Sequence, residues 1–184
     1  MTPMAHIASG YLVAQVVNLI NPALGFDKPK IIITVIIGAT ISDIDILFVR
    51  NIKDHRDSIL HLPFFWLIVL VTGYIFSLLI NNELFKMIIF GFGLGMFLHF
   101  FLDWLTVDEK GTGDMKLLYP LSNKRFAFNP KQATGKEYSN EYIFSMKYIK
   151  SYMTGRFLFF EILFIVLGIL VFLIKSNILK LLIN

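Results

Sequence analysis

Ionisable side chains interrupt several apolar segments of this 184-residue chain, and their spacing suits metal chemistry. The clearest pair is His99 and Asp103 in FLHFFLDWLT, four residues apart, so both side chains lie on one face of a helix. An aspartate in the middle of a membrane helix costs roughly 2.5–3.5 kcal/mol unless it is paired, solvated or bound to an ion. The pair can bind one divalent metal, or Asp103 can orient the imidazole that does. The alternative is a structural hydrogen bond within a helical bundle.

Two further segments contribute the same residue types. SDID contains Asp43 and Asp45, and carboxylates at the end of a helix, where the macrodipole is negative, favour a nearby cation. HRDSILH contains His55, Arg56 and His61. An arginine beside imidazole and carboxylate ligands is the usual partner of phosphate oxygens, which it grips with two parallel hydrogen bonds. Solvated aspartates and an ordinary polar loop are the alternatives for these two segments.

The fourth histidine of the chain, His6, is on its own typical of a surface or interfacial residue. The chain has no cysteine, which excludes thiolate ligands and disulfides. A metal site must therefore use histidine and carboxylate ligands, which suit zinc first and also manganese or magnesium. The candidate metal ligands are His6, Asp43, Asp45, His55, His61, His99 and Asp103. Because this set exceeds the four ligands of a tetrahedral ion, we expect that it can hold two ions.

This set of residues indicates hydrolysis by metal-activated water. A carboxylate that does not bind metal, Asp43 or Asp45, would serve as general base, and Arg56 would contact the substrate's phosphate. Two other functions use the same residues: transport of a divalent cation, and a non-catalytic membrane protein with a structural polar cluster. Transport is disfavoured because a permeation path needs polar groups toward the other end of the bundle as well.

The composition indicates that these residues belong to a membrane protein. Hydrophobic residues make up 56% of the chain and charged residues 16%, whereas soluble domains carry about a quarter charged residues. We expect one all-α, membrane-embedded domain over 1–184, a bundle of four to five spans. About 20 apolar residues cross a bilayer, and the expected spans are 4–20, 31–48, 62–80, 84–106 and 157–174.

The basic residues predict the orientation. If the spans alternate, segments 1–3, 49–61 and 107–156 share one side, which receives twelve of the 17 Lys and Arg residues and should be cytoplasmic. All seven candidate ligands then lie at the cytoplasmic end of a bundle in the cell (inner) membrane. The sequence has no nucleic-acid-binding motif or basic stripe. The expected partner is a membrane lipid or a lipid-linked phosphate.

The segment 107–156 is the only sizeable polar part of the chain. Its PLSNKR motif places Ser122 and Arg125 where they can contact an anionic headgroup, or it is a basic interfacial loop. Residues 140–154 are typical of an amphipathic helix on the membrane surface. Glu161, one turn into the last span, is expected at the interface, with contact to the metal as an alternative.

The order of these motifs resembles the membrane-bound metal-dependent hydrolases of bacteria and archaea, the YdjM-like inner-membrane proteins. The resemblance extends from near the N-terminus to about residue 128. It rests on His6 with Gly10, on Asp43 with Asp45, on His55, Arg56 and His61, on His99, Asp103 and Thr106, and on Gly113 with the segment from Pro120.

The resemblance implies a divalent-metal hydrolase embedded in the membrane, with a ligand pattern similar to zinc-dependent phospholipase C sites. The chain departs from the family pattern in two places. Leu60 and Leu62 flank His61 where we expect Thr and Ser, which affects hydrogen bonding to that histidine. The interval 107–112 is longer than is usual in the family, which would change the edge of the metal site.

Overall fold

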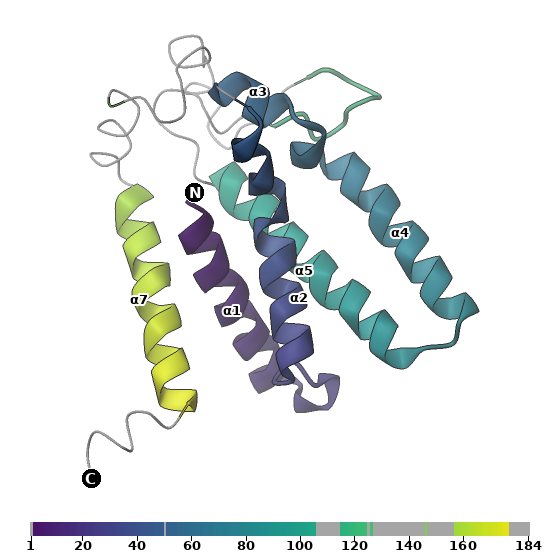
Figure 1. The fold of residues 1–184 in the computed structure, drawn as a ribbon, viewed down its shortest axis with the longest axis vertical. Coiled ribbons are helices and arrows are strands. Elements are labelled where there is room, and N and C mark those ends of the chain that lie inside the picture. The colour runs from purple at the N-terminus through teal and green to yellow at the C-terminus, as the bar shows by residue number, and fades with distance from the viewer. Residues whose placement is uncertain are drawn as a thin grey trace.

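The structure is a computed structural model that describes residues 2–49, 51–105, 115–124, 126, 146 and 157–176. The described part of the chain is all-α, without β-strands, and Met115 and Phe126 form an isolated antiparallel bridge. Its main helices are α1 (Pro3–Ile20), α2 (Pro29–Thr40), α4 (Pro63–Leu79), α5 (Glu83–Leu105) and α7 (Phe157–Lys175). They run side by side as a bundle, in the order α7, α1, α2, α5, α4 across Figure 1.

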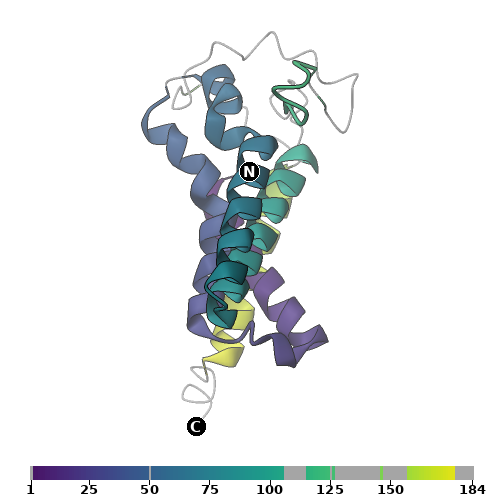
Figure 2. The same cartoon turned by 90° about the vertical axis from the view of Figure 1, so that its right-hand side faces the viewer.

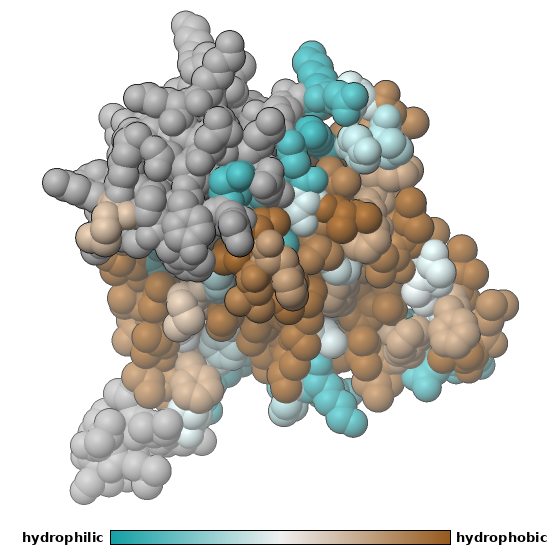
Figure 3. Space-filling view, turned by 45° about the horizontal axis from the view of Figure 1, so that its top comes forward, coloured by the Kyte–Doolittle hydropathy of each residue, from teal (hydrophilic) through white to brown (hydrophobic). Residues whose placement is uncertain are grey.

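Three of these helices are long and apolar enough to cross a membrane, namely Pro3–Ile20, Glu83–Leu105 and Leu158–Lys175. The helix α4 is apolar but shorter, with 17 residues. Hydrophobic side chains cover the flanks of the bundle in Figure 3, as expected for surfaces that face lipid. The expectation of an all-α membrane bundle is confirmed.

The second expected span, 31–48, differs from a single helix. The α-helix α2 ends at Thr40, and the chain continues as a 3₁₀ helix, η2 (Ile41–Leu47). The polar side chains of SDID fall in this 3₁₀ segment, where short polar side chains compete with the regular helical hydrogen bonds. Ser42, Asp43 and Asp45 are all buried there. The change of helix type therefore coincides with the residues expected to bind metal.

The connection between η2 and α4 completes one end of the bundle. It contains the short helices α3 (Ile52–Asp57) and η3 (Ile59–His61). In Figure 2 these helices lie at the same end of the molecule as the N-terminus, and the C-terminal end of α7 lies at the opposite end. The first helix starts at this end too, with Thr2 as its N-cap and a proline at its first position.

The helices α2 and α5 approach so closely that two positions require glycine. A Cβ at Gly95 would overlap the carbonyl oxygen of Val35 and lie 2.7 Å from the amide nitrogen of Ala39. A Cβ at Gly38 would overlap the carbonyl oxygen of Phe92. Small residues permit this backbone contact between membrane helices. The contact matters for the site because His99, one turn beyond Gly95 on α5, hydrogen-bonds the carbonyl oxygen of Ala39 near the end of α2.

Candidate metal centre

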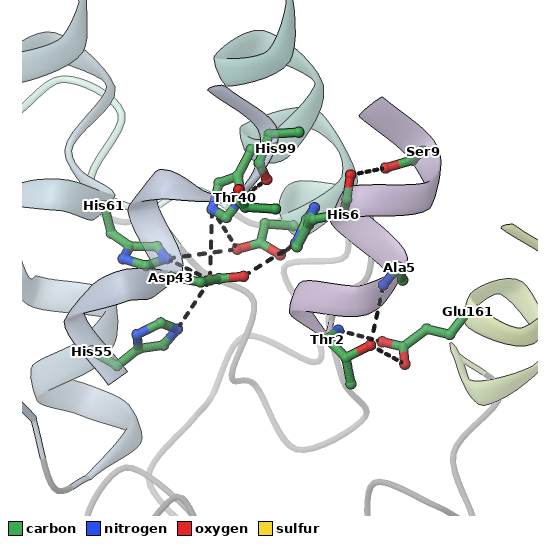
Figure 4. Close-up of polar contacts among 12 residues, drawn as sticks. Thr2, Ala5, His6, Ser9, Thr40, Asp43, His55, His61, His99 and Glu161 are labelled. Carbon is green, nitrogen blue, oxygen red and sulfur yellow. Dashed lines mark hydrogen bonds and ion pairs between the residues drawn. The ribbon is translucent and has the colours of Figure 1, made fainter. Parts of the chain in front are cut away.

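Four histidines and three aspartates from five helical segments meet at one end of the bundle. Figure 4 shows the four histidines around Asp43. The helix α1 contributes His6, η2 contributes the two aspartates of SDID, α3 and η3 contribute His55 and His61, and α5 contributes His99 and Asp103. His6, His61 and His99 have no exposed surface. The structure thus brings all seven candidate ligands together, in surroundings that exclude most solvent.

Asp43 lies at the centre of this cluster and is close to every histidine of the chain. Its Oδ1 atom is 3.5 Å from Nε2 of His61, 3.8 Å from Nε2 of His55 and 3.9 Å from Nε2 of His99. Its Oδ2 atom is 3.9 Å from Nε2 of His6. These separations exceed a hydrogen bond, and Oδ2 makes no hydrogen bond within the described part of the chain.

Asp45 contacts two of the imidazoles at Nδ1, the ring nitrogen that does not face Asp43. His55 Nδ1 is 2.6 Å from one carboxylate oxygen of Asp45, and His61 Nδ1 is 3.0 Å from the other. A carboxylate accepts hydrogen bonds, so both Nδ1 atoms carry a proton, and in the neutral form of each imidazole Nε2 carries the lone pair. This is the arrangement by which proteins orient histidines that bind metal. The groups of residues able to hold an ion do not include Asp45.

His99 is oriented by the backbone instead of a carboxylate. Its Nδ1 donates a hydrogen bond to the carbonyl oxygen of Ala39, at 2.9 Å, because a carbonyl can only accept. The lone pair is therefore on Nε2, which is buried, makes no hydrogen bond to any residue that the structure describes, and lies 3.6 Å from Asp103 Oδ2. Ala39 is also the residue against which Gly95 packs, so the close contact of α2 and α5 places its carbonyl beside the imidazole.

Asp103 connects the first helix to the arginine of α3. Its Oδ1 atom is 3.3 Å from His6 Nε2, and its Oδ2 atom pairs with the guanidinium of Arg56. The imidazoles of His6 and His99 are also in contact, with ring centroids 4.3 Å apart. The side chains of His55 and Arg56 are 12% and 11% exposed, so among the described members of the cluster these two have the most contact with solvent.

The arrangement favours a bound cation. In the neutral imidazoles, the Nε2 lone pairs of His61 and His99 face carboxylate oxygens at 3.5–4.0 Å, which is repulsive unless a proton or a metal ion lies between them. Two ligands of one tetrahedral zinc ion lie about 3.3 Å apart, given bonds of about 2.0–2.1 Å. Three groups of ligand atoms lie within 4.8 Å of one another. They are His6 with Asp43 and His99, Asp43 with His55 and His61, and His61 with His99 and Asp103.

The imidazoles of His55 and His61, which lie outside the membrane spans, respond differently to their surroundings. Burial lowers the pKa of His55 below the usual histidine value, although its contact with Asp45 opposes this. Burial also disfavours the charged form of His61, but the carboxylates of Asp43 and Asp45 outweigh it and raise the pKa of that histidine. The carboxylates therefore draw positive charge to the position of His61.

The loop around His61 has its own hydrogen bonds despite the leucines that flank this histidine. The backbone amide of His61 donates to the carbonyl of Ser58 at 2.9 Å, and the indole of Trp66 donates to the carbonyl of Leu60 at 2.8 Å. The hydroxyl of Ser58 accepts from the amide of Leu60 at 3.3 Å. A backbone network thus stabilises η3 without the Thr and Ser of the family pattern.

The other residues singled out from the sequence lie apart from the metal cluster or outside the described residues. Ser122 accepts a hydrogen bond from the amide of Lys124 at 3.1 Å, within its own turn. Glu161 contacts Thr2 at the start of α1 and is absent from the groups able to hold an ion. Arg125, Thr106, Gly113, the interval 107–112 and all of the 140–154 segment except Met146 lie outside the described residues.

Two structural contributors to the site were missed by sequence reasoning. The carbonyl of Ala39 that orients His99 leaves no signal in the sequence, because every residue has one. The need for glycine at Gly38 and Gly95 leaves a weak signal, since small residues in apolar segments often mark helix contacts.

Comparison with known proteins gives one result. The family model described as YdjM inner membrane protein matches residues 1–179. No curated protein and no solved structure matches the chain.

Proposed function

The chain belongs to the YdjM inner membrane protein family, and from this premise and the geometry above we propose that it is a divalent-metal-dependent hydrolase. The observation that carries the proposal is the set of buried Nε2 lone pairs, on His61 and His99, that face the carboxylates of Asp43 and Asp103. Zinc suits this mixture of imidazole and carboxylate best, with manganese or magnesium as alternatives.

The ligands divide between two ends of the cluster. His6 and His99 approach Asp43 from the side of α1 and α5, while His55 and His61 approach it from the side of α3 and η3. Asp43 belongs to two of the three ligand groups, and its Oδ1 atom, which lies nearest to Nε2 of His55, His61 and His99, would be the atom that binds metal. A divalent ion in such a site acidifies water and polarises a phosphoryl oxygen.

The chain's own residues supply the remaining steps. Asp43 Oδ2, which is buried and makes no hydrogen bond within the described residues, can accept a proton from the attacking water. Asp45 holds the imidazoles of His55 and His61 in the orientation that presents Nε2. The guanidinium of Arg56, which pairs with Asp103 at the cluster, would bind a phosphate oxygen pair.

We propose a phosphoester of a membrane lipid or of a lipid-linked molecule as the substrate. The 3₁₀ helix that carries the two central aspartates also exposes Ile44 and Leu47, and Phe48 follows it with 82% of its surface exposed. Since α3, which carries Arg56, contacts η2, these apolar side chains would suit the chains attached to an anionic headgroup at Arg56. We further propose that this end faces the cytoplasm, as the distribution of Lys and Arg predicts.

The test begins with metal content. Protein purified in detergent without chelators should hold zinc or manganese in whole-number stoichiometry by elemental analysis, and His99→Gln should lose most of it. Glu83→Ala is the control, because Glu83 lies at the opposite end of α5 with its side chain 80% exposed. Wild-type protein without any bound divalent metal would contradict the proposal.

Activity is tested next with a panel of lipid phosphates, by release of the phosphorylated headgroup or of inorganic phosphate. Turnover by the wild type that is lost in His99→Gln and retained in Glu83→Ala is the expected result. The competing function, transport of a divalent cation, is tested in liposomes. Cation flux by a protein that hydrolyses none of the phosphates would favour transport.

A further inference from the structure

Glu161 is a buried carboxylate that the proposed chemistry does not use. It is the only charged residue in the segment FLFFEILFIVLGILVFLI of α7, and it is 3% exposed. A charged carboxylate in such surroundings is costly unless it is paired or hydrogen-bonded. Its position therefore requires an explanation, which the start of α1 provides.

Both carboxylate oxygens of Glu161 contact Thr2, which is 159 positions away in the sequence (Figure 4). The backbone amide of Thr2 donates to Oε1 at 2.7 Å, and its hydroxyl donates to Oε2 at 3.0 Å. The same hydroxyl accepts from the amide of Ala5 at 3.4 Å, as the N-cap of α1. Glu161 thus binds the residue that starts the first helix.

The charge of Glu161 also suits this position. The first turn of α1 contains no acidic residue, although a negative charge is favourable at the positive end of the helix dipole. The helix α7 provides that charge from outside α1. Below this contact, α1 and α7 continue to pack through Ala8 against Gly168 and through Tyr11 against Phe172.

His6 lies one turn beyond this contact on the same helix. Its backbone amide donates to the carbonyl of Thr2 at 3.2 Å, so the position of Thr2 determines where the turn that carries His6 begins. The imidazole of His6 then reaches Asp103 at 3.3 Å and Asp43 at 3.9 Å. A continuous series of hydrogen bonds therefore connects Glu161, through Thr2, to the metal cluster.

We propose that Glu161 is a positioning residue of the metal centre, because by binding Thr2 it fixes the first turn of α1 and so the imidazole of His6. This inference rests on the proposed function, in which His6 is a metal ligand. It assigns a role to α7, which contributes no ligand of its own within the described residues.

The test compares zinc affinity and the state of His6 in matched variants of the full-length protein. Zinc affinity is measured by competition with a chromophoric chelator. Glu161→Ala should weaken it by about tenfold or more, as removal of a residue that orients a ligand does. Glu161→Gln, which keeps an acceptor for the amide of Thr2, should lose less. Gly168→Ala is the structural control, since its Cβ would lie 3.1 Å from Ala8 and disturb the packing of α1 on α7 away from Thr2.

The second measurement does not need metal. The chain has four histidines, so each ring can be followed by ¹⁵N resonances in metal-free protein. In Glu161→Ala the ring signal of His6 should move or broaden while that of His55 stays, and Gly168→Ala should leave both unchanged. An unchanged His6 signal in Glu161→Ala overturns the inference, even if zinc affinity falls, because the loss would then be general.

The two readouts separate this inference from the proposed function. If the wild type binds no divalent metal, the proposed function fails, and the His6 signal alone decides whether Glu161 positions that residue. If Glu161→Ala does not fold, Thr2→Ala and Thr2→Ser replace it, since serine keeps the hydroxyl that Glu161 accepts from. Weaker zinc binding and a displaced His6 signal in Thr2→Ala but not in Thr2→Ser support the inference, and equal behaviour of the two overturns it.

Discussion

Replacing Asp45 with asparagine should separate orientation of a ligand from direct metal binding. Asp45 accepts from the Nδ1 atoms of both His55 and His61, at 2.6 Å and 3.0 Å. Asparagine has almost the same shape, but its amide group can accept from only one of the two. The other imidazole would meet an NH₂ group, which favours the tautomer with the proton on Nε2, where the ion should bind.

The expected size of the effect follows from the loss of one oriented imidazole. Removing the partner of a metal-binding histidine lowers affinity by about 10–100-fold, or about 1.4–2.8 kcal/mol of binding free energy. Asp45→Asn should therefore weaken zinc binding by this factor while saturating metal still gives the wild-type stoichiometry. Asp43→Asn, in contrast, should lower the stoichiometry itself, because Asp43 belongs to two of the three ligand groups.

Zinc titration against a chelator of known affinity, in detergent, measures both quantities. Asp27→Asn is the matched control, since it makes the same chemical change at an exposed position in the connection before α2. Asp45→Asn that binds zinc as tightly as Asp27→Asn would refute the proposed orienting role. A lowered stoichiometry in Asp45→Asn would show instead that Asp45 is itself a ligand.

Two further predictions concern packing and metal removal. Gly95→Ala should weaken zinc binding and lower the melting temperature, because its Cβ would overlap the carbonyl of Val35 and lie 2.7 Å from the nitrogen of Ala39. Gly93→Ala on the same helix should be tolerated, since its Cβ meets only the flexible side chain of Leu70, at 3.2 Å; equal losses in both variants would contradict the assigned contact. Chelation should destabilise the wild type, by about 2.7 kcal/mol relative to protein with zinc at 100 times its dissociation constant. A melting temperature that does not respond to chelator would count against a metal that binds the folded state.

The positions of the helices were largely predictable from apolar runs. The expected spans 4–20, 62–80 and 84–106 lie within one residue of α1, α4 and α5 at each end. Length and hydropathy suffice for such helices because the bilayer requires continuous backbone hydrogen bonding. The expected span 31–48 differs from the structure because apolarity alone cannot distinguish an α-helix from the 3₁₀ segment that begins at Ile41.

The approximate composition of the site was also predictable, because alternating spans place every histidine at one end. The different roles of Asp43 and Asp45 were not predictable. Asp43 and Asp45 are two positions apart in one motif, yet one lies among the Nε2 atoms and the other behind the imidazoles. This difference depends on the winding of η2 and on where η3 lies beside it, which the sequence pattern does not specify. The contact of Glu161 with Thr2 depends in the same way on how α7 packs against α1.

The spacing along α5 has a consequence for how such a chain can change over time. Gly95, His99 and Asp103 follow one another at intervals of four, so one face of the helix carries both the contact with α2 and two polar side chains of the cluster. Each residue of an α-helix turns the chain by about 100°. Inserting or deleting a single residue between Gly95 and His99 would turn the imidazole by about this angle away from Asp43, whereas the connection between α4 and α5 lies at the opposite end of α5 from the cluster.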